Sequence, residues 1–144
     1  MSGTGDDSRI TGIDSVEAPT DAVNVKTIQD GRLLFGVASG SNNAFEVDLE
    51  PAVAAYVPGM VLHFQANHAV TGDATLEVNG LGAIPVRKHF SEELDENDIR
   101  ENQLVTVIFD GTNFQMLSQL GNAPAAGGGG GKFDPTLIYT TNGF

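Results

Sequence analysis

The chain has 144 residues, enough for one domain with a single core and a tail at each end. It carries 7 basic and 19 acidic residues, and the resulting net charge of -12 repels phosphate backbones, which excludes a general nucleic-acid binder. Cysteine is absent, which excludes disulfides and thiolate metal sites, and no apolar run approaches the ~20 residues of a membrane-spanning helix. We therefore expect no nucleic-acid partner and no membrane insertion.

The N-terminal part divides into an arm and a short helix. Residues 1–20 are rich in Gly, Ser, Thr and Asp and are typical of a flexible or extended arm. Residues 21–31 favour a helix with Asp21 as N-cap and Gly31 at its end, although an irregular lead-in fits equally well. A helix this short is not stable alone, so we expect packing against other copies in a trimer. The candidate contact residues are Ala22, Val25 and Ile28.

Residues 32–120 have the pattern of a β-domain. Asn79-Gly80 and Asp110-Gly111 are typical two-residue hairpin turns, and other Gly, Pro and Asn clusters separate the remaining apolar segments. We predict a mostly β fold, a small antiparallel β-sandwich or barrel with a short N-terminal helix and extended N- and C-terminal arms. The expected strands are 32–38, 44–49, 60–66, 75–79, 83–88, 104–109 and 113–118. The expected core residues are Phe45, Val47, Leu49, Leu62 and Phe64, with Val105, Val107, Phe109, Phe114 and Met116 meeting across the last hairpin.

Two connections interrupt the strands. Residues 51–57 predict one helical turn or a short cover over one end of the domain. Residues 91–102 predict a wide acidic loop that has Leu94 and Ile99 as its only apolar anchors. Its carboxylates do not have the spacing of an EF-hand, so we interpret them as a solvated turn rather than a calcium site.

The C-terminal part predicts a linker and a docking peptide. Residues 121–132 include five consecutive Gly and are typical of a flexible linker. Residues 133–144 are β-prone but too few to bury themselves, so we expect them to dock on another subunit or protein, or else to dock on their own domain or stay mobile. The candidate partner-binding residues are Phe133, Leu137, Ile138, Tyr139 and Phe144.

The sequence offers no catalytic constellation. There is no Cys and no Gly-x-Ser-x-Gly nucleophile motif, and we expect neither enzyme activity nor a cofactor. His63, His68 and His89 could bind a metal only as a cluster, and we favour surface or hydrogen-bonded histidines without one. A polysaccharide hydrolase would need paired carboxylates across a cleft. A sugar-binding module would need aromatic platforms, for which Tyr56 and Phe90 are the loop candidates.

Two sets of segments resemble tail fibres of tailed phages. The first comprises Ile10-Thr-Gly-Ile and Pro19-Thr-Asp-Ala-Val-Asn-Val-Lys-Thr-Ile-Gln-Asp, which are similar to a recurrent lead and helix of these fibres. The second set is similar, in order and strand length, to a β-rich module of phage tail fibres and related virion appendages. Its segments are Asn42-Asn-Ala-Phe-Glu-Val, Tyr56-Val-Pro-Gly-Met-Val-Leu-His-Phe, Gly72-Asp-Ala-Thr-Leu-Glu-Val-Asn-Gly-Leu-Gly, Ile84-Pro-Val-Arg-Lys and Phe109-Asp-Gly-Thr-Asn-Phe-Gln-Met-Leu.

This resemblance spans residues 10–118 and implies a homotrimeric structural protein of a virion tail or of a related contractile injection machine. It implies no catalytic residue. The expected function is a structural component of a viral tail that helps attachment to the particle and recognition of the host surface. The expected partners are other copies of the chain, other tail, baseplate or capsid proteins, and a host surface glycan. The alternatives are a carbohydrate-binding or adhesive module and a capsid decoration or head-fibre protein.

Overall fold

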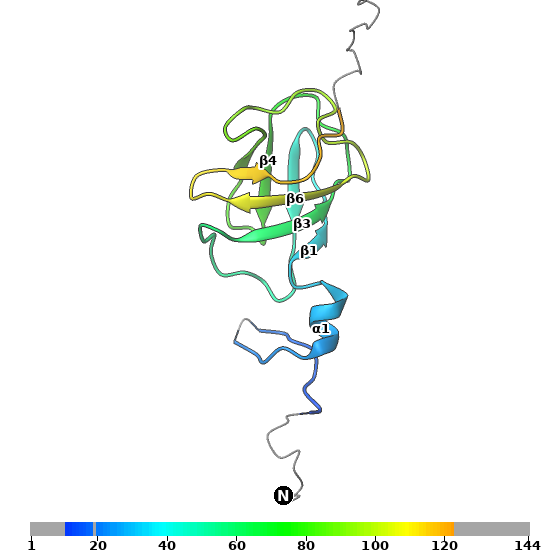
Figure 1. The fold of residues 1–144 in the computed structure, drawn as a ribbon, viewed down its shortest axis with the longest axis vertical. Coiled ribbons are helices and arrows are strands. Elements are labelled where there is room, and N and C mark those ends of the chain that lie inside the picture. The colour runs from blue at the N-terminus through cyan, green and yellow to red at the C-terminus, as the bar shows by residue number, and fades with distance from the viewer. Residues whose placement is uncertain (1–10, 19, 123–144) are drawn as a thin grey trace, which may run out of the picture.

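Seven strands form one sheet with the order β1-β3-β6-β7-β5-β4-β2 in the computed structural model. Figure 1 shows the neighbours β1, β3 and β6 side by side, with α1 at the β1 end. The structure describes residues 11–18 and 20–122, and the expectations for residues 1–10 and for the linker and docking peptide at 123–144 lie outside this part. The elements are α1 (Val25–Asp30), β1 (Phe35–Val37), β2 (Ala44–Val47), β3 (Val61–Gln65), β4 (Ala74–Val78), β5 (Ile84–Arg87), β6 (Leu104–Phe109) and β7 (Phe114–Met116). The predicted fold class, mostly β with one short helix, is confirmed.

The two edge strands of the sheet meet and nearly close it into a barrel. Just after β1, the backbone N–H of Ser39 donates to the carbonyl of Glu46 in β2 at 2.7 Å, and the N–H of Glu46 donates back at 3.0 Å. Gly36 makes the close approach possible, because a Cβ on this residue would lie 2.6 Å from Cγ1 of Val47. Closure leaves little free edge for pairing with another chain.

The strand pairing is mixed, so the prediction of an antiparallel arrangement holds for only part of the sheet. The pairs β3·β6, β4·β5 and β6·β7 are antiparallel, whereas β1·β3, β2·β4 and β5·β7 are parallel. Hairpins form where Asn79-Gly80 and Asp110-Gly111 turn the chain tightly. The other neighbours are separated in the chain by one or two strands that pair elsewhere in the sheet, and such non-sequential connections permit parallel pairing.

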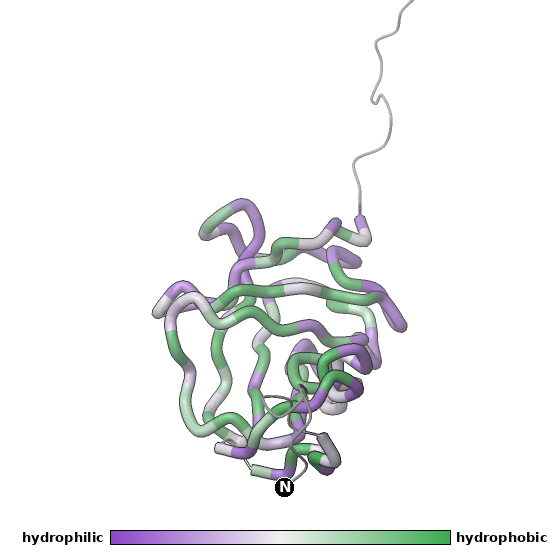
Figure 2. Tube along the Cα trace, turned by 60° about the horizontal axis from the view of Figure 1, so that its bottom comes forward, coloured by the Kyte–Doolittle hydropathy of each residue, from purple (hydrophilic) through white to green (hydrophobic). Residues whose placement is uncertain are grey.

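Alternating side chains fill the barrel interior as predicted. Figure 2 shows hydrophobic residues running along the strands and hydrophilic residues gathered in the protruding loops. The connection at 51–57 forms no helix, but it covers the core through Val53 and Tyr56. Met116 of the last hairpin is only partly buried. The predicted core residues that are confirmed as buried are Phe45, Val47, Leu49, Leu62, Phe64, Val105, Val107, Phe109 and Phe114.

The helix starts later than predicted. Its N-cap is Asn24, whose side-chain oxygen accepts a hydrogen bond from the Thr27 N–H at 2.7 Å. Asp21 instead accepts hydrogen bonds from the backbone of the preceding turn, so the prediction of Asp21 as N-cap is wrong and Ala22 precedes the helix. The predicted end at Gly31 is confirmed, because this residue takes the left-handed conformation with φ 71°.

Candidate interaction surfaces

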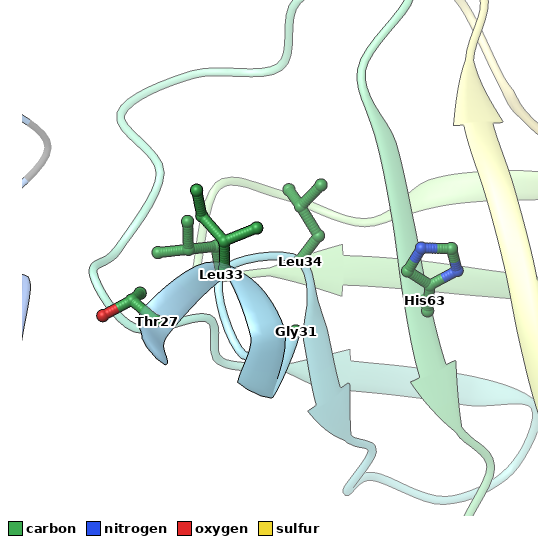
Figure 3. Close-up of a pocket in the computed structure, with 6 residues that line it drawn as sticks. Thr27, Gly31, Leu33, Leu34 and His63 are labelled. Atoms are coloured by element: carbon green, nitrogen blue, oxygen red, sulfur yellow. The ribbon is translucent and has the colours of Figure 1, made fainter. Parts of the chain in front are cut away.

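The helix α1 presents apolar side chains to solvent. Thr27 is its only buried residue, while Val25 is 68% and Ile28 is 63% exposed. Ile28, Leu33 and Leu34 line a shallow hollow of about 230 Å³ that reaches His63 on β3, as seen in Figure 3. The predicted contact residues of the helix are therefore accessible, and their exposed surface continues onto the barrel.

The acidic loop at 91–102 is not a wholly solvated turn. Leu94 and Ile99 are buried, as predicted, and they hold the loop against the barrel. This packing also buries Asp98, whose carboxylate lies 2.5 Å from the Lys88 ammonium, and the same ammonium lies 2.7 Å from Asp95. Hydrogen bonds to Asp95 and Asp98 raise the pKa of Lys88. The expectation of a solvated turn is therefore wrong for Asp98, because its buried ion pair with Lys88 fixes the loop.

The three histidines lie on separate elements. Nδ1 of His63 is 2.8 Å from the Thr106 hydroxyl, and Nδ1 of His89 is 3.1 Å from a Glu92 carboxylate oxygen. His68 stacks on Phe45 with ring centroids 4.4 Å apart. Within residues 11–18 and 20–122, no group of three or more His, Asp or Glu side chains is arranged to hold a metal ion. In the same part of the chain, no helix is long and apolar enough to cross a bilayer.

A polar groove lies between two loop tips. A bridge between Lys88 and Glu92 closes a tight turn in which His89 and Phe90 both have positive φ, 45° and 79°. Phe90 is 73% exposed at this tip. A groove of about 360 Å³ separates it from the turn between β6 and β7. The other lining residues are Ser91, Asp110, Thr112, Asn113 and Gln115.

Asp110 anchors the far side of this groove. Its carboxylate accepts hydrogen bonds from the Asn113 N–H at 2.7 Å, the Gln115 amide at 2.7 Å and the Thr112 N–H at 2.8 Å. These bonds hold the pKa of the Asp110 carboxyl below its usual value. Sequence reasoning singled out Phe90 but missed these polar neighbours, for which the only signal was the polar run that follows Asp110 in the hairpin turn.

Tyr56, the other aromatic candidate for sugar binding, is partly buried and packs against the core. Its ring packs against Phe109 and Phe114, each with centroids 5.4 Å away. Its hydroxyl donates to the Gly82 carbonyl at 2.7 Å and accepts from the Val78 N–H at 2.9 Å. Burial raises the pKa of this phenol. Both its ring and its hydroxyl are therefore engaged within the barrel.

Comparisons with known proteins do not identify the chain. No protein-family model matches the sequence, and no curated protein is significantly similar to it. The function is therefore argued from the residues and from the geometry described above.

Proposed function

We propose that this chain is a structural component of a viral tail, a tail fibre or fibre-like appendage, that assembles as a homotrimer on the virion and contributes to host attachment. The sequence resemblance over residues 10–118 supports this proposal. The arrangement of the chain also suits a fibre segment: α1 lies at one end of the barrel and the described chain leaves near the other end (Figure 1). Successive modules can then be joined end to end.

The exposed helix α1 is the observation that carries the proposal. It has 6 residues and buries only Thr27, whereas isolated helices shorter than about 12 residues are marginal in water. Val25 and Ile28 lie three positions apart, so both can face a threefold axis and pack against the same residues of two other copies. A partner surface would explain why apolar side chains occupy the outside of so short a helix.

The size of this contact can be estimated from burial. Full burial of one Val or Ile contributes roughly 1.5–3 kcal/mol, and about two-thirds of each of these side chains is exposed. Six such side chains in a trimer would contribute roughly 6–12 kcal/mol in total, and each of the two association steps that form a trimer costs about 4–15 kcal/mol. Contacts between the helices alone are therefore too weak to hold a stable trimer, and the barrels must contribute to the interface as well.

The test is the mass of the chain in solution and its response to charge on α1. We expect about 45 kDa by light scattering for three copies of the 15.1 kDa chain. The variants Val25→Asp and Ile28→Asp should lower this mass while the circular dichroism of the barrel is unchanged. Val57→Asp is the control, because Val57 is a similarly exposed valine, at 58%, that lies in the loop before β3 and not on α1. A trimer whose mass is unaffected by either helix variant would contradict the helix contact.

A second candidate function is a carbohydrate-binding module, and the groove beside Phe90 favours it. Aromatic rings stack on the apolar face of sugars, and acidic and amide side chains bind their hydroxyl groups. Phe90 supplies the first element, and Asp110 with Asn113 supplies the second. Binding on a glycan array that is lost in Phe90→Ala and retained in Val57→Ala would support this function. A chain that binds no glycan would leave only the structural function.

A further inference from the structure

Four neighbouring strands of the sheet, β1, β3, β6 and β7, carry no charged residue, whereas β2, β4 and β5 each carry one. None of β1, β3 and β6 contains Asp, Glu, Lys or Arg at any position. These strands are adjacent, and their register aligns two rows of outward-facing residues across them. We call this surface the neutral face, and its rows are Phe35, His63 and Thr106 in one and Val37, Gln65 and Leu104 in the other.

The neutral face exposes large apolar side chains. Val37 is 62% and Leu104 is 65% exposed, and Phe35 is 37% exposed. Leu117, which is 58% exposed, joins the same side through a hydrogen bond from its N–H to the Thr106 carbonyl. Several aliphatic side chains thus gather on one sheet face, and such a gathering marks an interaction surface more often than scattered exposed residues do.

Charge indicates which partner this face fits. The chain carries a net charge of -12, so two copies repel each other wherever their carboxylates approach. Glu46 of β2 and Glu77 of β4 are direct neighbours in the sheet, and Glu46 borders the neutral face through its backbone pairing with Ser39, just after β1. The neutral face contains no carboxylate, so it is the side of the barrel on which a second acidic copy can approach with least repulsion.

The neutral face is continuous with α1. The hollow lined by Ile28, Leu33 and Leu34 ends at His63, which is also a member of the neutral face (Figure 3). The three strands have three, five and six residues, and at about 4.8 Å between strands they cover roughly 230 Å² in flat projection. A stable interface buries about 800 Å² of each partner, so the sheet face alone is too small and needs the helix beside it.

We propose that the neutral face and the exposed side of α1 together form the contact between copies of this chain. This inference rests on the proposed homotrimer and specifies which surface of the barrel makes it. Glu46 and Glu77, on β2 and β4, then lie outside the contact. Polar His63, Gln65 and Thr106 lie between the aliphatic residues and supply hydrogen-bonding groups to the contact.

The experiment places carboxylates on the neutral face of the full chain. Val37→Glu and Leu104→Glu should each weaken association about tenfold or more, and the double variant should have the mass of a monomer by light scattering. Val57→Glu, at a similarly exposed position off this face, should keep the wild-type mass. Circular dichroism and thermal unfolding of the same samples establish that each variant retains the barrel.

Ionic strength supplies a second readout. Salt screens the repulsion between acidic copies, so association through an uncharged contact should tighten when sodium chloride is raised from low to high concentration. A contact built from ion pairs would weaken under the same change. Weaker association at high salt would therefore overturn the inference.

Three outcomes of the mass measurement separate the two proposals. A trimeric wild type whose mass is unchanged in the folded double variant would overturn the neutral-face contact and leave the proposed trimer standing. A monomeric wild type at every salt concentration would overturn both. A chain truncated after Asn122 tests the C-terminal segment: if truncation dissociates the trimer and the double variant does not, that segment and not the neutral face holds the copies together.

Discussion

Replacing Lys88 with methionine should strongly destabilise the barrel. The Lys88 side chain is 9% exposed and its ammonium contacts Asp98, whose side chain is 2% exposed, and Asp95, whose side chain is 76% exposed. Methionine retains an unbranched apolar stem but removes the cation. The Asp98 carboxylate would then stay buried without an opposite charge, and this penalty is the dominant effect.

The expected loss is about 3 kcal/mol of unfolding free energy. Removing one partner of a buried ion pair costs roughly 3–5 kcal/mol. The lower end applies here because Asp98 keeps a hydrogen bond from the Asp95 N–H at 2.7 Å, and because exposed Asp95 gives water access to the cluster. For a domain of this size, a loss of 1 kcal/mol of unfolding free energy lowers the melting temperature by roughly 4 °C. The melting temperature of Lys88→Met should therefore fall by about 12 °C.

Urea and thermal unfolding of matched variants measure this loss. The double variant Lys88→Met with Asp98→Leu should recover much of the stability, because an apolar pair can replace a buried ion pair at little cost. Lys26→Met is the control, since Lys26 pairs with Asp30 on the surface and should cost less than about 0.5 kcal/mol. A loss below about 1 kcal/mol in Lys88→Met, or a double variant less stable than the single one, would refute the reasoning.

The ion pair also predicts how the stability difference between wild type and Lys88→Met depends on pH. The raised pKa of Lys88 means that its stabilising contribution is fully present below the ordinary lysine value of 10.5 and is lost as pH rises through the higher value of the folded state. The stability difference between wild type and Lys88→Met should therefore be constant near neutral pH. It should shrink in alkaline solution, as pH rises above 10.5.

Three further changes test other parts of the barrel. Gly36→Ala should cost about 1–3 kcal/mol in urea unfolding, because its Cβ would lie 2.6 Å from Cγ1 of Val47 where the edge strands meet. His68→Phe should raise stability by up to about 1 kcal/mol: it keeps the stack on Phe45 and removes Nε2, which is buried without a partner among the described residues, while it loses only the exposed hydrogen bond between Nδ1 and the Asn67 side chain. Lower stability in this variant would show that the imidazole is satisfied. For Asp110, whose pKa is lowered, the stabilising contribution is present above 3.8 and lost as pH falls, so the stability advantage of wild type over Asp110→Ala should shrink in acid.

Local chemistry made much of the fold predictable. Asn79 and Gly80 take positive φ in the turn between β4 and β5, and Gly111 does so between β6 and β7, as their residue types favour. Period-2 alternation identified the buried positions, because one face of each strand must leave water. These are properties of residues close together in sequence, so a single sequence carries them.

The helix start and the acidic loop were less predictable, because distant contacts decide between local options. Asp21 and Asn24 are both suitable N-caps, and Asn24 takes this role while its amide nitrogen donates to the Ile13 carbonyl of the arm at 2.7 Å. Likewise, every carboxylate at 91–102 favours solvent by itself. Asp98 is buried because Lys88, ten residues earlier, lies beside it in the fold.

For the candidate surfaces, the sequence by itself determined the net charge of -12, the apolar positions of the helix and the absence of charged residues in three strands. Only the tertiary structure decided that β1, β3 and β6 are neighbours, although they are far apart in the chain. The physical reason is that strand order depends on long-range pairing and on the closure between Ser39 and Glu46, whereas alternation and turn chemistry act locally. The fold thereby gathers uncharged residues from three separate segments into one face.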